Sequence, residues 1–142
     1  PGIQSADTIP TDGWGAGAMI GALLEGAAGF GDQGSRFEDL LLSPRWGADP
    51  AFSQVRAVAR YAASDAYAAY LWRREEGRIT LTLTGTAESA YVRVLIPQEI
   101  ARLPLRVTRD GEELPAQIDL VGKTPHVAVP VAGGDATISI EW

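Results

Sequence analysis

The sequence predicts a mainly β protein, an antiparallel β-sandwich of about eight to ten strands with one N-terminal α-helix. Short runs in which apolar and polar residues alternate recur from about residue 31 to the end of the chain. Turn residues separate these runs at regular intervals, and the chain contains 16 glycines and 9 prolines. One segment near the N-terminus instead repeats its apolar residues with helical spacing. Many short, evenly spaced strands are typical of a sandwich or a barrel, and we favour the sandwich.

The composition is that of an ordered globular domain and excludes several classes of function. Apolar residues make up 46% of the 142 residues and charged residues 21%. The net charge of −6 argues against a nucleic-acid-binding or membrane-binding surface. The chain has no cysteine and one histidine, which excludes disulfides, a thiol nucleophile and a multi-histidine metal site. We therefore expect no metal, cofactor, nucleic acid or membrane partner.

The helix is expected over residues 16–28. Its apolar positions, which follow the spacing i, i+3, i+4, i+7, i+8 and i+11, are Ala16, Met19, Ile20, Leu23, Leu24 and Ala27. Gly26 or Gly29 is expected to end it. Gly17 and Gly21 lie inside it, and each costs up to about 1 kcal/mol relative to alanine. Because glycine permits close approach, we expect this helix to pack tightly against a large neighbour outside the sequence.

The strands follow in order along the rest of the chain. The expected strands are 40–43, 53–61, 66–74, 78–84, 91–96, 103–108, 113–116, 118–121, 127–131 and 137–142. The pairs at 64–65 and 110–111 are turn sequences, and the second, Asp-Gly, is a strong hairpin signal. These turns predict antiparallel pairing of the strands on either side.

Catalytic motifs are scarce. The sequence has no nucleophile-elbow, Walker A, zinc-protease or dinucleotide-binding motif. The adjacent carboxylates at 38–39 and 75–76 would point to opposite faces of a strand, so neither pair suits acid–base catalysis. Glu25 is either a general acid, if buried, or a structural residue, and His126 is either a general base or a sheet residue. We favour the structural alternative for both and assign no catalytic residue.

Tyr70 and Trp72 are the aromatic residues best placed to bind a ligand. They lie two residues apart on one predicted strand and therefore share a face. Two rings on one exposed face can stack against sugar rings, as in carbohydrate-binding modules. Aromatic residues on strands also commonly pack in the core, and this alternative stays open.

Two groups of segments in this order resemble the C-terminal end of the six-hairpin glycosidases. The first group is GWGA at 13–16, LEGAAGF at 24–30 and LSPRW at 42–46, and the second is VARYAASDAYAAY at 58–70 and VLIP at 94–97. The six-hairpin glycosidases are (α/α)6-barrel enzymes that include α-L-rhamnosidases and relatives of the glycoside phosphorylases. In that family a late barrel helix ends in such a glycine-rich segment, and a segment like LSPRW leads into a C-terminal β-sandwich.

The resemblance implies a division of the chain and a function. Residues 1–30 would be an irregular lead-in and the end of an (α/α)6 barrel, and residues 31–142 a C-terminal β-sandwich. The family's catalytic carboxylates belong to the barrel, so this chain would be a non-catalytic scaffold portion of a glycoside hydrolase acting on oligo- or polysaccharide. Residues before the late helix often line the sugar pocket, which makes Asp12 and Trp14 the matching substrate-binding candidates.

The expected partners follow from this reading. They are the catalytic (α/α)6 barrel of the parent chain and a carbohydrate, and a start at Pro1 rather than Met agrees with a processed or excised segment. The alternatives are a stand-alone carbohydrate-binding module and a purely structural assembly domain. Without a barrel, exposed apolar residues tend to associate, so we expect self-association through Met19, Ile20, Leu23 and Leu24.

Overall fold

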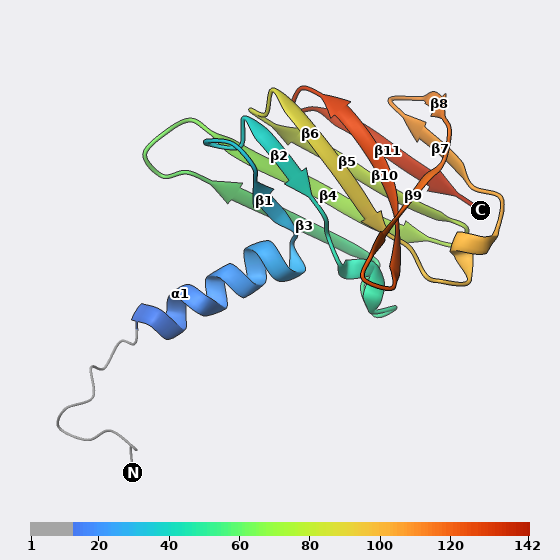
Figure 1. The fold of residues 1–142 in the computed structure, drawn as a ribbon, viewed down its shortest axis with the longest axis horizontal. Coiled ribbons are helices and arrows are strands. Elements are labelled where there is room, and N and C mark those ends of the chain that lie inside the picture. The colour runs from blue at the N-terminus through green and yellow to red at the C-terminus, as the bar shows by residue number, and fades with distance from the viewer. Residues whose placement is uncertain (1–12) are drawn as a thin grey trace, which may run out of the picture.

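A computed structural model describes the backbone of residues 13–142 and the side chains of residues 15–142. It confirms a mainly β fold with an N-terminal helix (Figure 1). Two sheets pack face to face, and the helix extends away from one end of them. In the described part of the chain no helix is long and apolar enough to cross a membrane. The candidate Asp12 lies outside the described residues.

The first sheet has five strands in the order β1-β2-β6-β10-β9. Their bounds are Phe30–Asp32 for β1, Asp39–Leu42 for β2, Ser89–Leu95 for β6, Thr124–Ala132 for β10 and Gln117–Val121 for β9. Strands β2 and β6 are parallel, and the other neighbouring pairs are antiparallel.

The second sheet has six strands in the order β3-β4-β5-β11-β7-β8, all antiparallel. Their bounds are Gln54–Arg60 for β3, Tyr67–Glu75 for β4, Arg78–Gly85 for β5, Ala136–Glu141 for β11, Arg106–Arg109 for β7 and Glu112–Leu114 for β8. Two single 3-10 turns, Trp46–Ala48 and Ile100–Arg102, connect the sheets.

Each predicted strand has a counterpart in the structure, with ends that differ by up to three residues. Strand β1 was not predicted, because three residues are too few to show a period, and the parallel pairing of β2 with β6 was not predicted either. Asp110 and Gly111 both have positive φ, 54° and 84°, as a tight two-residue hairpin turn requires. The first strand of the sandwich, β1, begins at Phe30.

The core lies between the two sheets and is built by alternation along each strand. The fully buried aliphatic residues of this core include Leu42, Ile79, Leu81, Leu83, Val92, Val94, Val127, Ile138 and Ile140. Burial of each such side chain contributes about 1.5–3 kcal/mol. Trp72 lies among them and is the largest buried residue. The core of the sandwich therefore does not include the exposed residues of the helix, Met19, Ile20 and Leu23.

The helix begins with α1 (Gly13–Gly21) and continues as a π-helical turn (Ala22–Ala27). It starts three residues earlier than predicted. The amide of Ala28 donates to the Leu23 carbonyl at 2.8 Å, which closes the wide turn. Of the two glycines expected to end the helix, Gly26 and Gly29, it is Gly29 that does so, with φ of +74°. A Cβ atom at Gly29 would lie 2.1 Å from the Ser43 carbonyl carbon, so only glycine fits.

Candidate functional site

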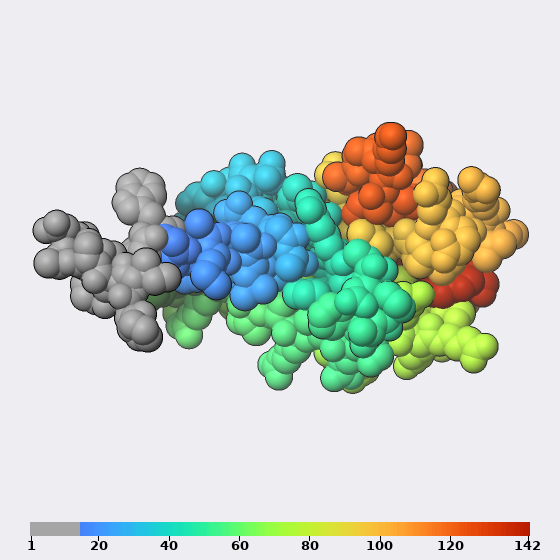
Figure 2. Space-filling view, turned by 90° about the horizontal axis from the view of Figure 1, so that it is seen from below, coloured from blue at the N-terminus to red at the C-terminus, as the bar shows by residue number. Residues whose placement is uncertain are grey.

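The helix presents an exposed apolar surface. The side chains of Met19, Ile20 and Leu23 are 75%, 58% and 58% exposed, and we call these three residues the apolar helix surface. Residues 13–24 include no charged or polar side chain. Figure 2 shows the helix, in blue, at one end of the described part of the molecule. A helix that is apolar on every side is normally buried against other parts of a protein.

Two details refine the expectation for this helix. Gly17 and Gly21 face open space, since, apart from their chain neighbours and the backbone of the helix itself, no atom of the described residues lies within 4 Å of a Cβ built on either. Leu24, which we expected on the associating surface, instead packs against the sandwich core. The tight neighbour expected beside the glycines is therefore not a part of the described sandwich.

Tyr70 fixes the end of the helix to the sandwich. Its hydroxyl donates to the Ala28 carbonyl at 2.9 Å and accepts from the Trp46 indole N–H at 2.6 Å. Burial raises the pKa of Tyr70 to about 12, so the hydroxyl stays protonated and remains a donor at neutral pH. The C-terminal end of the helix is therefore held against the sandwich at Ala28.

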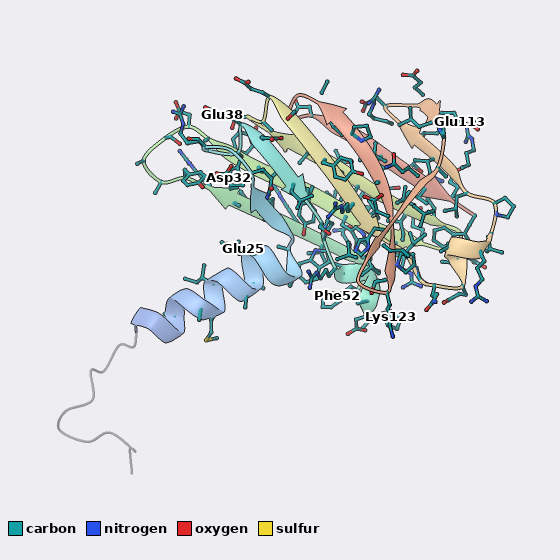
Figure 3. All side chains as sticks on the ribbon, viewed as in Figure 1. Glu25, Asp32, Glu38, Phe52, Glu113 and Lys123 are labelled. Atoms are coloured by element: carbon teal, nitrogen blue, oxygen red, sulfur yellow. The ribbon has the colours of Figure 1, made fainter. Side chains whose placement is uncertain are left out.

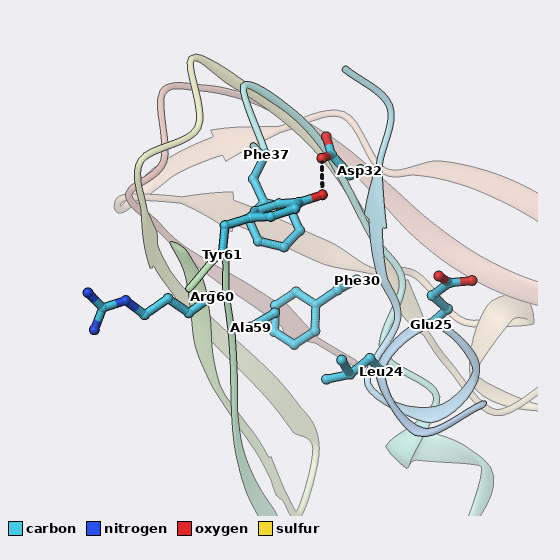
Figure 4. A pocket seen from close by; sticks show the side chains of 8 residues that line it. All are labelled: Leu24, Glu25, Phe30, Asp32, Phe37, Ala59, Arg60 and Tyr61. Carbon is cyan, nitrogen blue, oxygen red and sulfur yellow. Dashed lines mark hydrogen bonds between the residues drawn. The ribbon is translucent and has the colours of Figure 1, made fainter. Parts of the chain in front are cut away.

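A cavity of about 230 Å³ lies where the helix meets the sandwich, and we call it the junction pocket (Figure 4). The residues that line it are Leu24, Glu25, Phe30, Asp32, Phe37, Ala59, Arg60 and Tyr61. They come from the π-helical turn, from β1 and the turn after it, and from the end of β3. Figure 3 shows Glu25 and Asp32 at this same end of the molecule.

Aromatic rings form one wall of the junction pocket. The ring centroids of Phe37 and Tyr61 are 5.0 Å apart, and those of Phe30 and Phe37 are 6.4 Å apart. Phe30 and Phe37 are buried, whereas Tyr61 is 42% exposed. Phe37 has a φ of +62°, an unfavourable value for an aromatic residue that occurs more often at functional sites. With this backbone conformation, the Phe37 ring is buried and lines the junction pocket.

Asp32 is the best-defined polar group of the pocket. The Tyr61 hydroxyl donates to Asp32 Oδ2 at 2.7 Å, and the Gly34 amide donates to Oδ1 at 3.2 Å. The hydrogen bond from Tyr61 is the main cause that lowers the pKa of Asp32, and the same bond raises the pKa of Tyr61. At neutral pH the pocket therefore contains an ionised carboxylate beside a neutral phenol.

The pocket does not have the features of a hydrolytic site. Glu25 is exposed, so the burial that would suit it as a general acid is absent, in agreement with the structural alternative. Both oxygens of Asp32 already accept hydrogen bonds from the protein. No group of three or more metal-ligating side chains occurs among the described residues.

His126 is a structural residue of β10, as favoured. It is 2% exposed, and its Nδ1 lies 3.0 Å from the Thr124 carbonyl oxygen. Burial is the main cause that lowers its pKa, so the ring is neutral at pH 7. A substrate has no access to a side chain buried to this degree.

The ring-stacking surface predicted for Tyr70 and Trp72 is wrong. The two side chains do share a face of β4, but they are only 2% and 1% exposed because that face packs against the other sheet. Trp14 lies in α1, and its side chain, like all of Asp12, is outside the described part of the structure. None of these four residues lines the junction pocket.

Sequence reasoning missed the junction pocket. Asp32 and Tyr61 are 29 positions apart, so no local motif connects them. The available signal was weaker: two aromatic residues, Phe30 and Phe37, flank Asp32 in a segment that closely follows the helix.

Comparison with known proteins gives little further information. No family model and no curated protein matches the sequence. One similar solved structure is the α-1,4-glucan lyase of Gracilariopsis lemaneiformis, as a covalent intermediate complex with 5-fluoro-idosyl-fluoride. The identity is 13% and the TM-score 0.44, over 76% of this chain and 14% of the lyase chain. The chain therefore spans about a seventh of that enzyme's length, and so weak a similarity carries no conclusion about activity.

Proposed function

We propose that this chain is a non-catalytic β-sandwich module of a glycan-processing enzyme, and that an α-helical domain of the same polypeptide packs on its apolar helix surface. The observation that carries the proposal is the exposure of Met19, Ile20 and Leu23 on a helix with no polar side chain between residues 13 and 24. The resemblance of its sequence segments to the C-terminal end of six-hairpin glycosidases supports the link to glycans.

The all-round apolar character of the helix favours a helical domain as its neighbour. A second copy of the chain would cover one side of the helix, whereas a helical barrel or bundle covers several. Gly17 and Gly21 have open space above them, and such small residues let two helices approach closely. The proposed neighbour therefore accounts for two glycines that destabilise an isolated helix.

The site geometry supports a non-catalytic role. In the part of the chain that the structure describes, Glu25 is exposed, Asp32 is held by Tyr61 and Gly34, and His126 is buried. None of the three combines an accessible position with the partner group that acid–base catalysis needs. The carbohydrate-binding alternative has lost the stacking surface on which it depended.

Photo-crosslinking tests the proposal directly. A photoreactive phenylalanine derivative would replace Ile20 in the natural polypeptide, produced in its own cells, and crosslinked peptides would be identified by mass spectrometry. We expect crosslinks to a helical segment of the same polypeptide. The matched control is the same replacement at Lys123, which is exposed on a turn far from the helix (Figure 3) and should yield no such crosslink.

The other outcomes contradict the proposal. Crosslinks from position 20 to the same segment of a second copy would indicate the assembly-domain alternative. Equal crosslinking from positions 20 and 123 would show that the helix has no specific neighbour.

A further inference from the structure

Among the residues that the structure describes, two tyrosine–aspartate pairs occur, and only one of these two is completed by an arginine. On the outer face of the five-stranded sheet, the Tyr91 hydroxyl donates to Asp119 Oδ2 at 2.9 Å. Arg93 completes this pair: its Nε lies 3.4 Å from Asp119 Oδ2, and its guanidinium carbon lies 5.2 Å from the centre of the Tyr91 ring. The arginine thus neutralises the carboxylate and stacks on the phenol ring.

The junction pocket contains the same pair without the cation. The Tyr61 hydroxyl donates to Asp32 Oδ2 at 2.7 Å, as Tyr91 does to Asp119. None of the ion pairs among the described residues includes Asp32 or Glu25, the second carboxylate of the pocket. Arg60 lines the pocket, but its guanidinium extends away from both carboxylates (Figure 4).

The junction pocket has the capacity to bind a guanidinium group. A carboxylate offers about four acceptor positions. The Tyr61 hydroxyl and the Gly34 backbone amide occupy two of those of Asp32, and the backbone amides of Phe37 and Arg36 also lie close enough to lower its pKa, which leaves Glu25 as the more open carboxylate of the pocket. The Tyr61 ring is partly exposed at the mouth, where a planar cation can stack. The volume of about 230 Å³ is below the range of roughly 300–1,000 Å³ for drug-sized ligands, so it suits a single side chain.

We propose that the junction pocket receives an arginine side chain from the α-helical domain that packs on the apolar helix surface. This inference rests on the proposed function, because the pocket lies at the base of that helix, between Leu24 and Tyr61. The arginine would pair with Asp32 and Glu25 and stack on Tyr61, as Arg93 does with Asp119 and Tyr91. The pocket then fixes the register of the domain on the module.

A titration with a small probe tests the pocket separately from the helix. The isotope-labelled 142-residue chain would be titrated with N-acetyl-arginine methylamide and followed by NMR at low salt. We expect saturable shifts of the Tyr61 and Asp32 signals with a millimolar dissociation constant. The matched control is N-acetyl-citrulline methylamide, which has nearly the same shape without the charge and should bind at least about tenfold more weakly.

Variants locate the binding site. Asp32→Asn should weaken arginine-probe binding about tenfold and Glu25→Gln by a smaller factor, whereas Glu99→Gln, an exposed carboxylate elsewhere, should have no effect. Unchanged core signals would show that each variant is folded. Raising the salt concentration should weaken binding, because the contact is partly exposed.

Three outcomes would overturn the inference: no saturable shift, equal binding of the arginine and citrulline probes, or stronger binding of glucose, which would make this a neutral sugar pocket. None of these outcomes would contradict the proposal that a helical domain packs on the apolar helix surface, because crosslinking from position 20 tests that packing independently of the pocket. Conversely, Ile20→Glu with Leu23→Glu should abolish docking and leave probe binding unchanged.

Discussion

At the scale of single residues, Tyr70 has a structural role and not the ligand-stacking role that the sequence predicted. It connects the helix end, through the Ala28 carbonyl, with the Trp46 indole and the core. Sequence could not show this, because the residues on both faces of β4 are apolar or aromatic between Tyr67 and Trp72. Because the two faces of the strand do not differ in polarity, the alternation of apolar and polar residues cannot show which face is buried.

Replacing Tyr70 by phenylalanine tests that connection. Tyr70→Phe leaves the Ala28 carbonyl and the Trp46 N–H without their partner, so we expect a loss of about 1–3 kcal/mol in the free energy of unfolding. Urea denaturation measures it. Tyr67→Phe, on the same strand but exposed, is the control and should change stability by less than about 0.5 kcal/mol. An equal effect of both substitutions would contradict the assignment.

The same tyrosine predicts a dependence of stability on alkaline pH. Its pKa is about 12 in the folded chain and near 10 when unfolded. Because the pKa of Tyr70 is raised in the folded chain, the contribution of its protonated hydroxyl to the free energy of unfolding is fully present below pH 10. That contribution is lost as the pH rises from 10 to 12. The loss is at most roughly 2–3 kcal/mol. The unfolding free energy of Tyr70→Phe should fall less over this range than that of the original chain, and parallel curves would contradict it.

At the scale of elements, periodicity predicted the helix and the strands, and it failed where an element is short or its partner distant. The glycines of the helix differ in what requires them: Gly29 is required by its own backbone conformation, whereas Gly21 would matter only for packing against a neighbour. Gly29 has a positive φ and no room for a Cβ, whereas Gly21 lies in regular helix with open space around it. The sequence predicted that Gly26 or Gly29 would end the helix, but only the structure shows that it is Gly29 and that Gly21 is uncovered by the described residues.

Two alanine substitutions separate these roles. Gly21→Ala should stabilise the helix of this chain by up to about 1 kcal/mol, visible as increased helical circular dichroism, and should weaken any packing that uses the glycine surface. Gly29→Ala should destabilise the fold by at least about 2 kcal/mol, because the new Cβ meets the Ser43 carbonyl. A loss of helix in Gly21→Ala would show that the space beside it is not open.

At the scale of the whole molecule, the sequence predicted a mainly β sandwich with one N-terminal helix, and the structure confirms this fold class. The junction pocket arises only from tertiary structure, where the turn after β1 meets the end of β3. The proposed non-catalytic role predicts no turnover of aryl glycosides by this chain. Turnover by the pure chain that is abolished by Glu25→Gln would contradict that role.

The central claim is that the apolar helix surface is a docking surface and not part of the sandwich core. Sedimentation equilibrium of the 142-residue chain, with and without Ile20→Glu and Leu23→Glu, tests it most directly. In the absence of a helical domain we expect the original chain to self-associate at high concentration, since an exposed apolar surface tends to be covered. The double variant should be monomeric with unchanged strand circular dichroism. An original chain that stays monomeric, together with a double variant whose sandwich unfolds, would place the helix in the module's own core and contradict the claim.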